Sequence, residues 1–348
     1  MTFGSLLEKL KSKTDLTKED ISTIVRYFEE KKLNDKEIKD LVSSWREKGE
    51  TPFELNSLAE IVNLKQKQNE NFKDSIDMCG TGGDKLNTFN ISTLSAILAS
   101  SCGANVIKHS GRSTTSISGS VDVLEFFGID LNSSSEVKED CFKETRLMFV
   151  SSKILRDLLG NVKKVCKEIN IPGFVNLLGP LTNPYKTNHH LLGVSNIKWG
   201  ELLASTLQLQ GDKNALVVCS QISENIFLDE LSFCGVNYLW KVNGSQVLKE
   251  KLLPGDLGEN NVDVNDLTIK DINESKVVFE GVLKDALNVK DNIDSKINVV
   301  ALNTGAALYL TKKVNSIANG YKLAQEHLNT GKTWEHFQNF INSMKVRT

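Results

Sequence analysis

The sequence predicts an α/β protein with a small N-terminal helical domain and a larger α/β domain that has a mostly parallel central sheet. Apolar residues recur at helical spacing in the first fifth of the chain, with no strand signal. From about residue 73, short β-branched runs alternate with longer amphipathic segments, and glycine-rich loops follow two of the runs. We place the helical domain at residues 1–72, completed by about 160–185, and the α/β domain at 73–348.

The N-terminal region contains clear signals for the ends of helices. Leu6, Leu7 and Leu10 mark the first apolar stripe, and Thr17 has the character of an N-cap with acidic residues after it. A further helix is expected over 34–48, ended by Gly49, and Thr51-Pro52 begins the next one. These signals predict a helical module.

Five apolar runs in the larger region predict strands, and alternation with helices favours a parallel arrangement. The runs are Ser75–Cys79, Asn105–Lys108, Leu147–Ser151, Leu191–Val194 and Ala215–Cys219. The C-terminal region is expected to be helical again, over Ser316–Leu328 and Thr333–Met344.

Composition narrows the class of protein. A chain of 348 residues that is 40% hydrophobic can bury a substantial core, and its 42 basic and 44 acidic residues provide no global positive field for nucleic acid. The start lacks the apolar core of a signal peptide, and no run is long enough to cross a bilayer. We therefore expect a cytoplasmic protein without a membrane partner. The six cysteines form no C-x-x-C pair, so we expect reduced, mostly buried thiols.

The stretch from Asp77 to Asp84, with Gly80, Gly82 and Gly83, runs from a predicted strand through a glycine-rich turn toward a helix. Glycines permit positive φ and let successive N–H groups converge on a phosphate, where the helix N-terminus adds positive potential. The spacing is neither the Walker motif nor G-x-G-x-x-G. On these residues alone, a phosphate cradle and a tight turn without a ligand are about equally supported.

A second loop, Lys108 to Ser120, combines cations with many hydroxyl groups after another predicted strand. Such donors suit a sugar phosphate, although a solvated Ser/Thr-rich turn has the same composition. Because ligands of parallel sheets bind at the carboxyl ends of the strands, two such loops favour the binding interpretation. We assign His109 no proton-transfer role, since a histidine beside a lysine more often serves as a hydrogen-bonding scaffold.

Asp229 and Glu230 form an adjacent acidic pair after an apolar strand. Adjacent carboxylates repel unless a cation joins them, and oxygen ligands near phosphate favour magnesium over zinc. Most acidic pairs are solvated surface features, so only the position near the two loops favours a metal site. His189-His190 has no third ligand at a useful spacing, and we interpret that pair as structural.

In order and spacing, these motifs resemble the anthranilate phosphoribosyltransferase family over nearly the whole chain. The matching blocks are Arg46–Thr51, G-T-G-G-D at 80–84, T-F-N-I-S-T at 88–93, Lys108-His109, 118–120 with 122–125, L-G-P-L-T-N-P at 178–184, and Leu228–Glu230. The resemblance implies a fold of the nucleoside phosphorylase/phosphoribosyltransferase type, a homodimer formed through the helical part, and transfer of phosphoribose from phosphoribosyl pyrophosphate to the amine of anthranilate in tryptophan biosynthesis. Magnesium is the implied cofactor.

The resemblance also implies site residues. Donor contacts would come from Gly80, Gly83, Asp84, Thr88, Asn90, Ser92, Thr93, Lys108, Ser116 and Ser120. Magnesium would be held by Ser92, Asp229 and Glu230, and the acceptor side would include Gly80, Gly111, Pro172 and Gly179. No residue is assigned as a catalytic acid or base, because an arylamine already presents a neutral nitrogen.

The acceptor positions depart from the family's pattern. The family's K-H-G-N-R loop has an asparagine where this chain has Gly111, and its arginine before F-N-x-L-G-P-L has no counterpart near Pro172. A His-Pro pair is absent from 150–155, and Ile117 replaces a lysine. Because arginine binds carboxylate in a bidentate fork, its loss weakens the expected acceptor site, and Lys163, Lys164 or Lys167 could replace it as a point charge.

Three alternatives therefore stay open. A paralogue could transfer phosphoribose to another aromatic or heterocyclic acceptor. A pyrimidine nucleoside phosphorylase would share the architecture, but the T-F-N-I-S-T and L-G-P-L-T-N-P blocks favour the transferase. A noncatalytic relative that binds nucleic acid is disfavoured by the near-neutral charge and by the acidic pair.

Overall fold

The computed structural model describes residues 2–66, 68–111, 117, 119–169, 173–211, 214–258, 262–284 and 293–347. Its N-terminal region is helical, as predicted: α1 (Phe3–Lys11), α2 (Lys18–Glu29), α3 (Asp35–Lys48) and α4 (Pro52–Gln66). The Thr17 side chain accepts a hydrogen bond from the Asp20 N–H, and the Asp20 side chain accepts one from the Thr17 N–H, which closes a capping box at α2. Gly49 ends α3 at a φ of 91°, a conformation that glycine adopts without strain.

One sheet forms the centre of the larger region. Its strands are β1 (Ile76–Gly80), β2 (Val106–His109), β3 (Leu147–Val150), β4 (His189–Gly193), β5 (Asn214–Ser223), β6 (Ile226–Leu228), β7 (Val236–Asn243) and β8 (Gln246–Leu252). The order is β3-β2-β1-β4-β5-β7-β8, and β6 pairs with β5. Neighbouring strands from β3 to β5 are parallel, which confirms the mostly parallel sheet. The antiparallel strands β6, β7 and β8 were not predicted.

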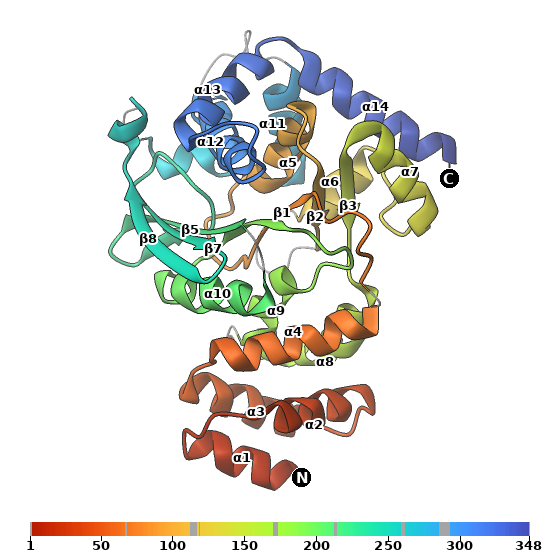
Figure 1. Cartoon of the computed structure of the whole chain (residues 1–348), viewed down its shortest axis with the longest axis vertical. Helices are drawn as coiled ribbons and strands as arrows, with labels where there is room; N and C mark the ends of the chain where they lie inside the picture. The colour runs from red at the N-terminus through yellow and green to blue at the C-terminus, as the bar shows by residue number, and fades with distance from the viewer. Residues whose placement is uncertain are drawn as a thin grey trace.

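Helices cover both faces of the sheet (Figure 1). They are α5 (Ile91–Ser101), α6 (Ser120–Phe126), α7 (Ser135–Thr145), α8 (Lys153–Glu168), α9 (Phe174–Leu178), α10 (Ile197–Gln210), α11 (Ile272–Lys284), α12 (Ile293–Leu310), α13 (Ile317–Leu328) and α14 (Lys332–Arg347). Short 3-10 turns lie at η1 (Gly179–Leu181), η2 (Pro254–Leu257) and η3 (Val264–Leu267). Figure 1 shows α5 and α11 to α14 on one side of the sheet, and α10, α4 and α8 on the other.

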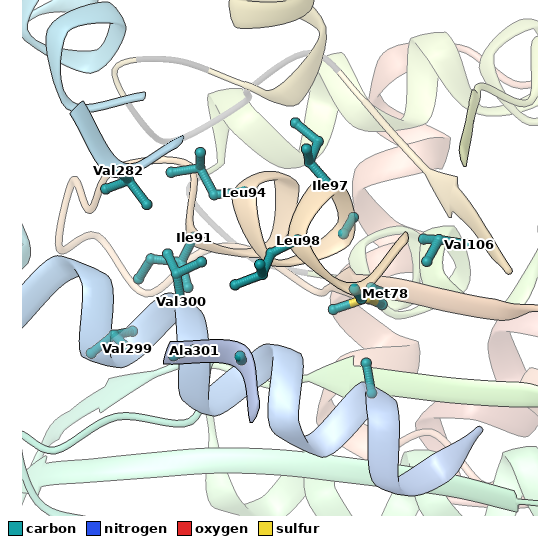
Figure 2. Packing of buried hydrophobic residues seen from close by; sticks show 14 of the residues in the cluster. Met78, Ile91, Leu94, Ile97, Leu98, Val106, Val282, Val299, Val300 and Ala301 are labelled. Carbon is teal, nitrogen blue, oxygen red and sulfur yellow. The ribbon is translucent and has the colours of Figure 1, made fainter. Parts of the chain in front are cut away.

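Helix α5 is the centre of the larger core. Its residues from Ile91 to Ser100 are buried except Ser92, so it is covered on nearly all sides. Figure 2 shows Leu94, Ile97 and Leu98 packed among Met78 and Val106 of the sheet and Val299 to Ala301 of α12. The helix that follows the glycine turn is thereby held rigidly against the sheet.

The second core joins the helical region to the opposite face of the sheet. Trp45 of α3 packs against Phe174 of α9 with ring centroids 4.5 Å apart, and Leu159 of α8 and Leu192 of β4 belong to the same buried cluster. Helices α8 and α9 thus lie with α2 to α4, although they follow β3 in sequence. The division into two domains at residue 72 stays a prediction.

Two composition-based expectations concern the cysteines and the membrane. All six cysteines are free; five are buried, and Cys102 is partly exposed. In the described ranges, no helix combines the length and the apolar character needed to cross a bilayer.

Candidate active site

The glycine turn leaves the end of β1 at the carboxyl edge of the parallel strands. Gly82 and Gly83 have φ values of 63° and 87°, which a residue with a Cβ rarely adopts. Neighbouring loops hold the turn in place: the Thr81 N–H donates to the Gly193 carbonyl at 2.9 Å, and the Ser195 hydroxyl donates to the Gly82 carbonyl at 2.8 Å. The turn is therefore a fixed structure that leads into α5.

The acidic pair lies directly against this turn. The Gly82 N–H donates to Asp229 Oδ2 at 2.8 Å. A Cβ on Gly80 would lie 2.5 Å from the same carboxylate oxygen, and a Cβ on Gly193 would lie 1.6 Å from the Asp229 carbonyl oxygen. Two glycines on neighbouring strands thus make room for the backbone and the carboxylate of Asp229, 147 residues away from Gly82 in sequence.

Three carboxyl groups gather here with little positive charge. Burial and the nearby Asp229 charge raise the pKa of Asp84 to about 7, and burial together with Asp229 raises the pKa of Glu230 to about 8. Burial also raises the pKa of Asp229, against the hydrogen bond from Gly82. Because oxygen ligands favour a hard cation, Asp229 and Glu230 fit a magnesium ion, whose charge would offset the repulsion among these carboxyl groups.

Lys108 is the cation that acts on these carboxylates. It is 2% exposed at the end of β2, and its Nζ donates to the Met78 carbonyl and to Ser92 Oγ, the latter at 3.1 Å. The charge of Lys108 partly offsets the effect of burial on the pKa values of Asp229 and Glu230, and Ser92 hydrogen-bonds to Glu230. The structure therefore brings Ser92, Lys108 and the acidic pair together.

The other sequence-predicted donor residues lie at the start of α5 and α6. Thr93 Oγ1 donates to Ser120 Oγ at 2.9 Å, which links the two helix starts. Asn90 Oδ1 accepts from Ser275 of α11 at 2.7 Å, and Thr88 forms a bridge with Thr268. Ser116 lies outside the described residues.

His109 is held through both ring nitrogens. Its Nδ1 lies 2.8 Å from the Gly179 carbonyl and must donate, and its Nε2 accepts from the Ser152 N–H at 3.3 Å. Burial lowers the pKa of His109; Asp77 and Gly179 act in the opposite direction, and the charges of Lys163 and Lys108 lower the pKa further. A neutral ring with both nitrogens engaged suits the scaffold role that the sequence suggested.

Besides Gly80, two of the expected acceptor positions, Gly111 and Gly179, lie within the described residues. Gly179 lies beside His109 through the contact just described, and a Cβ on Gly111 would meet nothing within 4 Å. Pro172 falls outside the described residues.

Of the candidate lysines on α8, Lys163 differs from Lys164 in its surroundings. The Lys164 ammonium points to Asp35 at 3.7 Å and to Glu168 at 3.8 Å, with 62% of its side chain exposed. Lys163 keeps contact with solvent, yet burial lowers its pKa and its charge acts on His109. The Lys163 ammonium is thus close enough to His109 for its charge to lower the pKa of that ring, while part of the side chain is exposed to solvent.

Sequence reasoning missed Asp77. This residue is fully buried in β1; its Oδ1 accepts from the His109 N–H at 2.9 Å, and its Oδ2 accepts from Asn183 Nδ2 at 2.8 Å. Burial would raise the pKa of Asp77, but the hydrogen bond and charge of His190, with His109, bring the pKa down to about 2. A charged residue within an otherwise apolar strand was the signal that could have identified it.

Ser220 and Asn303 were also missed. The Ser220 hydroxyl donates to the Glu230 carbonyl at 2.7 Å, and Asn303 accepts from the Leu231 N–H at 3.0 Å while donating to the Leu231 carbonyl at 2.8 Å. These bonds fix the segment that follows the acidic pair. No local pattern marks either residue, because the contacts join distant parts of the chain.

The sequence and the fold of this chain are similar to those of known glycosyl transferases. Residues 72–334 match the model of a glycosyl transferase family, a/b domain. Among curated relatives, the chain is 35% identical to an anthranilate phosphoribosyltransferase of Halalkalibacterium halodurans over 87% of this chain and 86% of that protein. The chain is also 31% identical to an anthranilate phosphoribosyltransferase of Nitrosopumilus maritimus, over 97% of this chain and 95% of that protein. The chain belongs to the anthranilate phosphoribosyltransferase family.

Solved structures agree in fold. An anthranilate phosphoribosyltransferase from Thermus thermophilus superposes with a TM-score of 0.86 at 26% identity, covering 98% of this chain and 99% of that one. The Saccharomyces cerevisiae enzyme in complex with PRPP and Mg gives a TM-score of 0.86 at 23% identity, over 99% and 98%; at this identity the likeness concerns the fold alone.

Proposed function

We propose that this protein transfers the 5-phosphoribosyl group of phosphoribosyl pyrophosphate to the amine of anthranilate and releases pyrophosphate. The observation that carries the proposal is the hydrogen bond from the Gly82 N–H to Asp229 Oδ2 at 2.8 Å. It joins a phosphate-binding type of turn to a pair of carboxylates that need a cation. Diphosphate chelated to magnesium satisfies both groups together.

On the donor side, the proposed contacts are the residues expected from the sequence: Gly80, Gly83, Asp84, Thr88, Asn90, Ser92, Thr93, Lys108, Ser116 and Ser120. Asp229, Glu230 and Ser92 would hold magnesium, which neutralises charge that develops on the departing pyrophosphate. Lys108 is fixed by Ser92 and the Met78 carbonyl, so its ammonium needs no rearrangement to face a phosphate. The N–H groups of the turn and the start of α5 add positive potential.

No side chain is proposed as a base. The amine of an arylamine is neutral near neutral pH and attacks the anomeric carbon directly. His109 could not accept a proton without losing the bond from the Ser152 N–H to its Nε2. Positioning of the two substrates and stabilisation of the leaving group then supply the rate.

On the acceptor side, we propose that Lys163 receives the carboxylate of anthranilate. The proposal is supported by the reach of its charge to His109, which is tied to Gly179, and by the engagement of Lys164 with other carboxylates. A lysine offers a point charge where arginine offers a planar fork, so the acceptor should be held less strictly in orientation. Gly80, Gly111 and Pro172 stay proposed acceptor-side positions.

The direct test is to incubate the purified protein with phosphoribosyl pyrophosphate, Mg²⁺ and a panel of anthranilate, other aminobenzoates and nucleobases. Ribosylated products are identified by mass, and pyrophosphate is measured in parallel. We expect Mg²⁺-dependent release with anthranilate as the best acceptor. A product with another acceptor only would indicate a paralogous transferase, and no release with any amine would refute the proposal.

The proposal extends to a cytoplasmic homodimer formed through the helical domain at 1–72, with segment 160–185 completing it. Light scattering coupled to size exclusion tests the dimer. A monomer at micromolar concentration would contradict it.

A further inference from the structure

We propose a second metal site, specific for a thiophilic divalent cation such as Zn²⁺ and formed by Asp77, Cys79 and His190. One ligand atom from each of these buried residues lies within 4.8 Å of the others. Its ligands come from β1 and β4, whereas the acidic pair Asp229-Glu230 follows β6.

Strand register explains the convergence. In the parallel pair β1 and β4, Asp77 is the partner of His190, and Cys79 lies two residues further along β1, so its side chain points to the same face as that of Asp77. His190 Nε2 lies 3.5 Å from Asp77 Oδ2 and 4.0 Å from Cys79 Sγ. The sheet itself therefore sets these positions.

The distances suit zinc after a small adjustment. Bonds of about 2.3 Å to sulfur and about 2.0 Å to nitrogen and oxygen, at tetrahedral angles, place S and N about 3.5 Å apart and N and O about 3.3 Å apart. The observed separations of 4.0 Å and 3.5 Å exceed these by a few tenths of an ångström. Side-chain rotation covers that difference, and water would take the fourth position.

The ligand types select the ion. Sulfur and imidazole favour Zn²⁺ or Co²⁺ over Mg²⁺, which prefers oxygen. On binding, the Cys79 thiol and the His190 Nε2 each lose a proton to solvent; Cys79 Sγ and His190 Nε2 then bond to the ion, and the His190 ring keeps its proton on Nδ1. Asp77 keeps its bonds from the His109 N–H and Asn183, which orient the carboxylate as outer partners of a metal site do.

The test uses Co²⁺ as a spectroscopic probe of the full chain, with excess Mg²⁺ present to occupy the oxygen-ligand site. We expect one equivalent of Co²⁺ to produce a thiolate-to-cobalt charge-transfer band and intense visible bands of a tetrahedral ion. Competition with Zn²⁺ should abolish both. Because the readout is absorption, failure of this proposal is distinguishable from failure of the proposed transferase activity.

Variants assign the site. Cys79→Ser and His190→Gln should each weaken Co²⁺ binding at least about tenfold, whereas Cys141→Ser, a buried thiol on α7, should bind as the parent does. His190→Gln retains a donor toward Asp77 and provides a second variant if Cys79→Ser fails to fold. Absence of the band in the parent, its persistence in Cys79→Ser, or its loss in Cys102→Ser would overturn the proposal.

Discussion

Asp229 Oδ2 accepts a hydrogen bond from the Gly82 N–H at 2.8 Å, so a carboxylate occupies one of the donors of a phosphate-binding type of turn. In the proposed complex a phosphate would lie beside this carboxylate, and a cation between the two anions would offset their repulsion. The acidic pair and the turn are therefore structurally linked, and substitutions in either should affect the proposed metal site.

The absence of a side chain at Gly80 leaves room for the Asp229 carboxylate. In Gly80→Ala the new Cβ would lie 2.5 Å from Asp229 Oδ2, so the carboxylate must move. We expect the Mg²⁺ concentration for half-maximal pyrophosphate release to rise roughly tenfold, about 1.4 kcal/mol. Gly160→Ala on α8 is the matched control, because its Cβ meets nothing within 4 Å. An unchanged Mg²⁺ dependence in Gly80→Ala would contradict the proposed metal site.

Removal of one negative charge should stabilise the metal-free protein. Burial and Asp229 raise the pKa of Asp84 to about 7, so ionised Asp84 is unfavourable at pH 8. Asp84→Asn should raise the free energy of unfolding without Mg²⁺ by on the order of 1 kcal/mol and should reduce activity. Thermal melts with and without Mg²⁺ measure both states, and Asp74→Asn, whose carboxylate is 97% exposed, should change neither. A lower melting temperature for metal-free Asp84→Asn would count against the charge argument.

Lys163 should govern acceptor binding without affecting the donor. We expect Lys163→Gln to raise KM for anthranilate about tenfold or more while KM for phosphoribosyl pyrophosphate stays constant, because only the acceptor carboxylate loses its partner. Lys163→Arg should retain binding. Lys164→Gln serves as the control, since that ammonium faces Asp35 and Glu168. Equal effects of the two glutamine variants would refute the assignment.

Gly111 has room for the amide found in the family's loop. A Cβ there meets nothing within 4 Å, so Gly111→Asn should fold normally. We expect a lower KM for anthranilate, by roughly threefold to tenfold, because an added hydrogen bond contributes about 1 kcal/mol. Steady-state kinetics with each substrate varied would check this, and an unchanged or higher KM would show that position 111 does not face the acceptor.

His336 should make the fold sensitive to acid. Its Nε2 lies 2.8 Å from Ser100 Oγ, and burial, with the charges of His327 and Arg146, lowers its pKa to about 4. In the unfolded state His336 takes up a proton near pH 6.5, whereas in the folded state it does so only near pH 4. Its contribution to the free energy of unfolding is therefore fully present above pH 6.5 and is lost as the pH falls to 4. We expect a loss of about 2 kcal/mol, discounted for partial exposure.

Urea unfolding at several pH values measures this loss. His336→Gln can still hydrogen-bond to Ser100 but carries no titrating group, so its stability should depend less on pH between 6.5 and 4. The same pH dependence in both proteins would show that other groups cause the loss.

The sequence predicted those helices whose ends are marked by capping residues, glycine or proline. Thr17, Gly49 and Pro52 marked helix ends correctly, because caps and positive φ depend on neighbouring residues. Strand β8, Gln246–Leu252, was missed because it is a largely exposed edge strand with alternating charges, which resembles a polar loop.

The site shows the limit of reading a sequence alone. Adjacent carboxylates such as Asp229 and Glu230 are most often solvated in other proteins, and here burial raises the pKa of both, with the charge of Asp229 adding to the shift at Glu230. Asp77 was overlooked for the same reason, since its partners His109 and Asn183 come from distant segments. A charged residue indicates a functional site only when it is known to be buried, and burial depends on the whole fold.

Helix α8 carries Lys163 and is capped by Ser152, whose N–H donates to the ring of His109. The helix packs with α2 to α4, so a tilt of the N-terminal helices would move Lys163 relative to the glycine turn at residues 80–84. With the role proposed for Lys163, binding of the acceptor would then depend on the position of the outer helices.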